Sequence, residues 1–413
     1  FIPEKLDKRQ LELAQSDGLR HHVKGSAGSG KTTIMAFRAV DAFRRTNEPV
    51  LILTFNITLR HYIRDCISHA LNSVSGIEGR KSYIMGKFFL ISHFHEFIKN
   101  YRNDHNQLDI EILDKKGKSV DTYELEAAPD KYRTIFVDET QDFKRGWLET
   151  IVNDLLEPNG EIVFFSDKDQ DLYQRRVLAT DSQEKSPPPI PGIKGHPLEL
   201  KGTYRLHTKI LDLARAFQIK FFDGSLGNEI EPPEVAGNLF DDTTIRYYFR
   251  EKFDVKEIVE IFESIIKEYQ IANDDVCILS QIVANVRPID EALRNKDYPT
   301  TTTFETEKDW QKICSLDKVN RDQKRDEIRR VAKHNFWMES GKIKLSTIQS
   351  YKGWGIHTEI LIIGNDFTPV TEKEKFLNAE MVYTGITRAK KNLVVINIGD
   401  REYDEFFCVS TKH

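Results

Sequence analysis

Short apolar runs alternate with longer amphipathic stretches along most of this chain. Runs rich in β-branched and aromatic residues that end in polar residues are typical of buried strands in a parallel sheet. In the first half of the sequence, four such runs predict strands, and two stretches with helical spacing predict helices. The strands are expected at 19–24, 50–55, 132–137 and 161–167, and the helices at 33–43 and 209–222. This alternation favours a parallel α/β fold.

The same pattern restarts after a polar, proline-containing stretch at 230–238, which we predict to be an interdomain link. An amphipathic helix is expected at 255–269. Strands are expected at 244–249, 276–280, 342–347, 359–363 and 392–398. We therefore predict two α/β domains, 1–238 and 239–413. Only the first contains a phosphate-binding sequence, which suggests that ATP is sandwiched at a domain interface.

The composition is that of a globular chain. Its 413 residues, of which 39% are hydrophobic and 30% charged, are enough for two or three compact domains. The formal net charge of −5 gives no overall basic field, so any nucleic-acid binding must use a local cleft that contains Lys and Arg. The cysteines are scattered without metal-ligand or paired spacing, as in a reduced intracellular protein: Cys66, Cys277, Cys314 and Cys408.

Targeting signals are also missing from the sequence. No apolar stretch approaches the roughly 20 residues that a bilayer-spanning helix needs. The N-terminus lacks the charged-then-apolar layout of a signal peptide. We therefore expect a cytoplasmic location without membrane association. The chain begins with Phe1, and a candidate nucleotide-contacting segment follows within ten residues, so we expect a further domain or effector upstream.

The strongest functional signal follows the first predicted strand, where the sequence fits the pattern G-x-x-x-x-G-K-S/T. In this pattern, glycines allow backbone N–H groups to surround phosphates, the lysine reaches the β- and γ-phosphate oxygens, and the hydroxyl residue binds Mg²⁺. The next helix directs its positive N-terminus toward the phosphates. The predicted phosphate loop comprises Gly25, Ser26, Ala27, Gly28, Ser29, Gly30, Lys31 and Thr32, with Thr33 following. We therefore expect ATP and Mg²⁺ as ligands.

An acidic pair stands at the carboxyl end of the strand predicted at 132–137. Ligands bind at this edge in open α/β sheets. Asp138 can hold Mg²⁺ directly or through water, and Glu139 can orient and deprotonate an attacking water. A solvated acidic turn is the alternative for this pair, and the phosphate loop upstream favours the catalytic interpretation. Together, the two segments predict a motor driven by ATP hydrolysis.

The order of further short segments resembles that of superfamily 1 helicases of the UvrD/Rep type, over residues 6–398. The segments similar to that family's motifs are 6–10, 54–56, 94–95, 166–173, 203–205, 346–353 and 382–389. The resemblance implies two RecA-like domains with ATP at their interface. It also implies ATP-dependent translocation on, or unwinding of, single-stranded DNA with 3′-to-5′ polarity.

The resemblance assigns roles to individual residues. Gln10 would read the adenine, and Gln170 would position the water beside the γ-phosphate. Tyr204 would stack on the base, and Arg205 would reach the γ-phosphate.

In the second domain, the resemblance places Gly353 in the segment that couples ATP to nucleic acid. Arg388 would reach the γ-phosphate only when the cleft closes. An arginine supplied across an interface accelerates phosphoryl transfer by roughly 10³ to 10⁵. Closure and hydrolysis would thereby be linked. If the affinity for a nucleic-acid strand differs between the open and closed states, the cycle would move the protein stepwise along that strand.

The expected nucleic-acid contacts combine polar groups with flat side chains on which bases can stack, each base contributing about 1–3 kcal/mol. The candidates are Thr54, Phe55, Asn56, Phe94, His95, Arg175, Thr347, Gln349, Ser350 and Trp354. For each of the flat side chains, ordinary packing in the core or at the surface is the alternative.

Some positions depart from the family pattern. Gly355 stands where the family has a glutamate that contacts the nucleotide sugar, and Arg175 replaces a stacking tryptophan. The insertions, at about 96–131 and 281–341, are smaller than the family's accessory subdomains. A basic stretch at 321–330 is expected to form a helix whose face is either solvated or in contact with nucleic acid.

These departures support translocation better than strand separation as the predicted activity. They also leave alternatives open. The chain could be an ATP-gated nucleic-acid binding or sensing module that regulates an attached or partner effector, such as a nuclease. It could also be an RNA-directed helicase, since no residue pattern here reads the 2′-hydroxyl. A degenerate ATPase is disfavoured because all the hydrolytic positions are filled.

Overall fold

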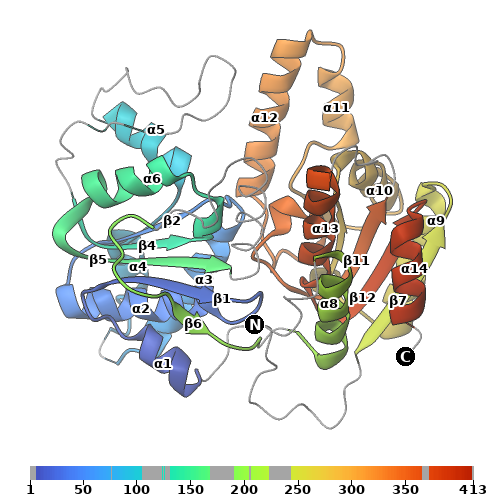
Figure 1. Cartoon of the computed structure of the whole chain (residues 1–413). Helices are drawn as coiled ribbons and strands as arrows, with labels where there is room; N and C mark the ends of the chain where they lie inside the picture. The colour runs from blue at the N-terminus through green and yellow to red at the C-terminus, as the bar shows by residue number, and fades with distance from the viewer. Residues whose placement is uncertain are drawn as a thin grey trace. The chain divides into compact units, whose positions relative to one another are not determined.

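The computed structural model describes residues 6–75, 77–104, 123, 125, 131–167, 190–203, 206–222, 243–364 and 372–411. The chain forms two compact units, residues 1–202 (unit 1) and 203–413 (unit 2) (Figure 1). Within the described residues, each unit contains a parallel sheet of six strands. In neither unit does the described part include a helix long and apolar enough to cross a membrane.

The strands of unit 1 run in the order β3-β2-β4-β5-β1-β6, and every neighbouring pair is parallel. They are β1 (Arg20–Gly25), β2 (Val50–Thr54), β3 (Phe89–His93), β4 (Tyr132–Asp138), β5 (Leu156–Asp167) and β6 (Leu198–Leu200). The helices are α1 (Lys8–Ala14), α2 (Lys31–Thr46), α3 (Leu59–Asn72), α4 (Lys81–Phe88), α5 (Phe94–Asp104) and α6 (Arg145–Thr150). Two short turns complete the unit, η1 (Thr140–Asp142) and η2 (Ile151–Leu155).

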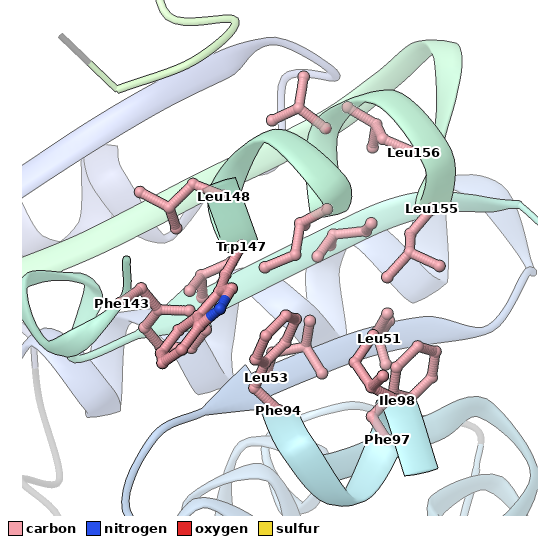
Figure 2. Packing of buried hydrophobic residues seen from close by; sticks show 14 of the residues in the cluster. Leu51, Leu53, Phe94, Phe97, Ile98, Phe143, Trp147, Leu148, Leu155 and Leu156 are labelled. Atoms are coloured by element: carbon pink, nitrogen blue, oxygen red, sulfur yellow. The ribbon is translucent and has the colours of Figure 1, made fainter. Parts of the chain in front are cut away.

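Burial on both faces of the sheet explains the continuous apolar runs of unit 1. All five residues of β2 are buried, as expected for a central parallel strand covered by helices on both sides. One core cluster contains Leu51 and Leu53 of β2, Phe94 of α5 and Trp147 of α6. Figure 2 shows these side chains meeting between the strand and the two helices. The carboxyl ends of the strands are thereby held on a rigid core.

The strands of unit 2 run in the order β7-β12-β11-β8-β10-β9, again all parallel. They are β7 (Thr244–Arg250), β8 (Val276–Ser280), β9 (Thr300–Thr302), β10 (Ile343–Thr347), β11 (Ile356–Gly364) and β12 (Ala389–Ile398). The helices are α8 (Thr208–Phe221), α9 (Val255–Tyr269), α10 (Val283–Asn295), α11 (Glu307–Ile313), α12 (Lys318–His334), α13 (Glu372–Ile386) and α14 (Arg401–Ser410). Two short turns are η3 (Asn273–Asp275) and η4 (Gln349–Tyr351).

The predicted fold class of two parallel α/β units is confirmed, and both sheets are consistent with RecA-like domains. The chain divides after Gly202, earlier than the expected boundary at 238, because α8 packs against β7, β12, α13 and α14. The expected link at 230–238 lies outside the described residues. The basic stretch at 321–330 falls in α12, which has no buried residue and forms a helical hairpin with α11 (Figure 1).

Candidate functional site

The carboxyl ends of three neighbouring strands meet in unit 1. β5 lies between β4 and β1, and the register places Gly25 of β1 opposite Asp167 of β5. On the other side, Asp138 ends β4 opposite Thr54 of β2. The phosphate loop and the acidic pair, which are more than a hundred residues apart in the sequence, therefore lie along the same edge of the sheet.

The phosphate loop has the backbone that its glycines predict. Gly28 and Gly30 have φ angles of +80° and +88°, in the left-handed region that side chains with a Cβ rarely adopt. The Ser29 hydroxyl is buried and, within the described part of the chain, makes no hydrogen bond. Helix α2 begins at Lys31, so its first N–H groups have no partner within the helix. Such a set of free donors suits an anion.

The ammonium group of Lys31 is held inside the loop. Its Nζ donates to the carbonyl oxygens of Gly25 and Ser26, at 2.7 and 2.9 Å. It also lies 3.7 Å from Oδ2 of Asp167, at the end of β5. The positive charge therefore sits at the position from which it can reach a phosphate.

Thr32 and Asp138 form a pair of oxygen donors suitable for Mg²⁺. The Thr32 hydroxyl lies 3.3 Å from Oδ2 of Asp138, whose side chain is buried. Burial, and then the charge of Glu139, raise the pKa of Asp138 to about 7, while the charge of Lys31 acts in the opposite direction. A cation beside Asp138 would relieve this cost.

This pair would not bind a metal by itself. No group of three or more His, Cys, Asp or Glu side chains in the described residues could hold an ion. Mg²⁺ commonly takes one or two protein oxygens and completes its shell with phosphate and water. Thr32 and Asp138 fit that mode of binding.

Glu139 follows Asp138 in a strained conformation. Its φ of +52° is unusual for a residue with a side chain and costs about 1–3 kcal/mol. Its N–H donates to Oδ1 of Asp138 at 3.1 Å. The carboxylate accepts a hydrogen bond of 2.5 Å from Nε2 of Gln141. The turn therefore fixes both the backbone and the side chain of the candidate base.

Gln10 braces the phosphate loop. Its Nε2 donates to the Ser29 carbonyl at 3.2 Å, and its Oε1 accepts from the N–H of Asp7 at 3.1 Å. The N–H of Gln10 in turn donates to the Asp7 carboxylate, which completes an N-terminal cap on α1. Both polar atoms of this buried amide thus have protein partners, and contact with adenine stays a prediction.

The expected nucleic-acid residues of unit 1 lie at the ends of β2 and β3. Phe55 is partly exposed and stacks on Trp147, with ring centroids 5.9 Å apart and planes at 17°. His95 contacts Phe55 edge-on. Burial, and then the charge of Lys144, lower the pKa of His95 to about 4. These rings form a platform with a neutral imidazole.

Other candidates from this region are less accessible. Phe94 has no exposed surface and packs in the core against Trp147, Phe143 and Tyr123, which removes it from the residues available for stacking. Thr54 is also fully buried, and its hydroxyl accepts the N–H of Asn56 at 3.2 Å. These two residues shape the strand end from inside.

In unit 2, Arg388 is buried and directed into its own unit. Nε donates to the carbonyl of Thr384 at 2.9 Å, Nη1 to that of Trp354 at 3.2 Å, and Nη2 to the Thr387 hydroxyl at 2.9 Å. Burial holds the pKa of the Glu359 carboxyl well above its usual range, while the charge of Arg388 acts in the opposite direction. A role at a phosphate would require this side chain to move.

The remaining candidates of unit 2 follow β10. Gln349 is exposed, and the Ser350 N–H donates to the hydroxyl of the partly buried Thr347 at 3.3 Å. Gly353 adopts a φ of +87°, and Trp354 is buried, which leaves little of its ring for stacking. Gln170, Arg175, Tyr204 and Arg205 lie outside the described residues.

Sequence reasoning missed Gln141 and Trp147. Gln141 belongs to the acidic string that begins at Asp138, but nothing in its spacing distinguishes it from a surface glutamine. Trp147 lies beyond that string, and only the fold brings it to Phe55.

Comparison with known proteins agrees with the phosphate loop. A family model described as an AAA domain matches residues 15–176. Residues 15–176 are therefore similar to a P-loop domain of a class that binds nucleotides. No curated protein matches the sequence.

One solved structure shows a loose likeness. The C-terminal domain of a possible DNA helicase from Lactobacillus plantarum WCFS1 aligns with 48% of this chain and 89% of its own length, at 14% identity and a TM-score of 0.29. A likeness at this TM-score supports no argument about function.

Proposed function

We propose that this chain is an ATP-dependent translocase or helicase that acts on single-stranded DNA and is similar to the UvrD/Rep type. The observation that carries the proposal is the convergence of four groups along one edge of the sheet in a region similar to an AAA domain. These groups are the Lys31 ammonium, the Thr32 hydroxyl, and the carboxylates of Asp138 and Glu139. Resemblance over residues 6–398 supplies the motor class and the 3′-to-5′ polarity.

Binding of ATP would use the phosphate loop. Its free N–H groups and the Ser29 hydroxyl would surround the phosphates, and Lys31 would exchange the Gly25 and Ser26 carbonyls for phosphate oxygens. Thr32 and Asp138 would hold Mg²⁺, which neutralises phosphate charge when bound.

Hydrolysis would use Glu139 as general base. Its carboxylate is fixed by the backbone turn and by Gln141, and it would orient a water and accept its proton. Gln170 and Arg205 are proposed, from the resemblance alone, to contact that water and the γ-phosphate.

The proposal for Arg388 is that it leaves its acceptors at Thr384, Trp354 and Thr387 and stabilises the transition-state charge. Because this exchange would depend on ATP, hydrolysis would be linked to a conformational change. Single-stranded DNA would contact the platform at Phe55 and His95 in unit 1. The segment 347–350 is the candidate contact of unit 2.

The test is ATP hydrolysis with single-stranded DNA, single-stranded RNA or duplex, at low and moderate salt. We expect a many-fold stimulation by single-stranded DNA. Stimulation by RNA alone would replace the DNA track by an RNA track. A Glu139→Gln variant is the control for contaminating ATPases. If the protein binds ATP but hydrolyses none under all of these conditions, the proposed motor function is refuted.

One observation favours a second candidate function. Arg388 is held by its own unit, as expected for an ATP-gated binding module whose hydrolysis awaits a partner. Displacement of a protein roadblock from a DNA strand separates the two candidates. A translocase displaces the roadblock in one direction, whereas a gated module leaves it in place while binding the strand in an ATP-dependent manner.

A further inference from the structure

Gln141 occupies a buried position between two strand ends. It lies in η1, directly after β4, and only 4% of its surface is exposed. Its amide group both donates and accepts hydrogen bonds. Nε2 donates to Oε2 of Glu139 at 2.5 Å, and Oε1 accepts the N–H of Asp167 at 3.2 Å. The side chain therefore bridges the ends of β4 and β5.

The turn that carries Gln141 is itself fixed. The Thr140 hydroxyl donates to the Val137 carbonyl at 3.2 Å, and the N–H of Asp142 donates to the Glu139 carbonyl at 3.0 Å. Phe143, which ends the turn, is buried in the core cluster beside Trp147. These contacts hold the backbone of the turn and so restrict the position of the Gln141 amide.

Asp167 extends this bridge to the phosphate loop. Its carboxylate is 3.7 Å from Nζ of Lys31, while its N–H is bound by Gln141. A continuous set of contacts thus runs from Lys31 through Asp167 and Gln141 to Glu139. A shift of Lys31 toward a phosphate would weaken its pairing with Asp167 and act on the residue that orients the base.

We propose that Gln141 is a positioning residue that holds the Glu139 carboxylate and ties it to the carboxyl end of β5. The inference rests on the proposed function, in which Glu139 is the general base. Gln141 does not touch the nucleotide in this assignment. It keeps one carboxylate oxygen occupied, so that the other is directed to the water.

The test compares Gln141→Leu, which removes both hydrogen bonds, with Gln141→Glu, which keeps the acceptor for the Asp167 N–H and removes the donor to Glu139. We expect the kcat of ATP hydrolysis to fall about 10- to 100-fold in both variants, since small displacements of reacting groups have effects of this size. The Kd for MgATP should change by less than about threefold, since the phosphate loop is untouched. Retained binding also shows that the variants are folded.

The matched control is Gln218→Leu. Gln218 lies in α8, is also buried, and belongs to unit 2, so the same change of side chain should leave kcat unaltered.

A double variant then separates positioning of the Glu139 carboxylate from a general structural effect. In a Glu139→Gln background, adding Gln141→Leu should slow single-turnover hydrolysis by no more than about twofold, because residues that act as a unit are not additive.

The possible failures are distinguishable. Wild-type turnover with an unchanged kcat in both Gln141 variants would overturn the positioning role and leave the proposed function intact. The positioning role would also be overturned if Gln141→Leu slowed single-turnover hydrolysis as much in the Glu139→Gln background as in the wild type, because Gln141 would then act independently of the base. ATP binding without wild-type turnover would remove the proposed function, and the inference with it.

Discussion

His22 should make unit 1 sensitive to acid. It lies in β1, just before the phosphate loop, and its side chain is buried. Burial, and then the charge of Lys24, lower the pKa of His22 from 6.5 to about 3. The folded protein therefore keeps this imidazole neutral, whereas the unfolded chain protonates it near its ordinary value. Because the unfolded chain binds more protons, keeping His22 neutral contributes fully to the free energy of unfolding above about pH 6.5. This contribution is lost as the pH falls toward 3.

The size of the effect follows from the shift. One pKa unit corresponds to about 1.4 kcal/mol. Between pH 7 and pH 5, protonation of His22 in the unfolded chain should therefore lower the free energy of unfolding by about 2 kcal/mol. This is a large fraction of the roughly 5–15 kcal/mol by which domains are stable.

The assay is urea denaturation at pH 5, 6 and 7 for the wild type and His22→Gln, whose amide does not titrate. The wild type should lose about 2 kcal/mol more than the variant from pH 7 to pH 5. His95 is present in both proteins, so its own protonation cancels in the comparison. Ser166→Ala is the control. It removes the group 2.7 Å from Nε2 of His22 but leaves the histidine buried, so the acid sensitivity should persist. A difference between wild type and His22→Gln that is constant across this range would refute burial as the cause.

Three further variants test the assigned roles. Glu139→Gln should bind ATP normally in a nucleotide titration while turnover falls by at least about 10²-fold, because only the base is lost. Lys31→Ala should raise the Kd for ATP at least about tenfold in the same titration, since it removes the cation of the loop. Arg388→Ala should keep ATP binding but lose turnover. It should also lower the stability of unit 2 in thermal unfolding, because the carbonyls of Thr384 and Trp354 lose their donor, at about 1–3 kcal/mol for each buried group left unsatisfied. Arg388→Lys should retain more stability, because its ammonium group can still donate hydrogen bonds, and equal stability of the two Arg388 variants would contradict this assignment.

Much of the fold could be predicted from local pattern. The apolar run at 50–55 became β2 at Val50–Thr54, and the helix expected at 255–269 is α9 with the same bounds. These predictions succeed because a strand or helix covered by the core must be apolar at every covered position. The phosphate loop was also predictable, because its backbone requires glycine at fixed positions, here Gly28 and Gly30.

The parts that could not be predicted depend on contacts between distant segments. In the sequence, an aromatic residue at a strand end looks the same whether it stacks on a base or packs against another ring. Only the folded chain shows that Phe94 packs against Trp147. Gln10 presents a similar case. Its amide suits an adenine edge, but the structure uses it to cap α1 and to hold the Ser29 carbonyl.

Arg388 shows why motif order alone leaves a mechanism incomplete. Its acceptors include the backbone carbonyls of Thr384 and Trp354, which do not depend on the side chains at those positions. A hydrogen bond to a charged group contributes roughly 1.5–3 kcal/mol, so a ligand that draws the arginine away must replace these hydrogen bonds. The γ-phosphate, with its multiple charged oxygens, matches the guanidinium fork, whereas water does not. If Arg388 acts as proposed, its hydrogen bonds within unit 2 keep the guanidinium group occupied until a triphosphate competes for it. The same contacts that stabilise unit 2 would then help to distinguish ATP from ADP.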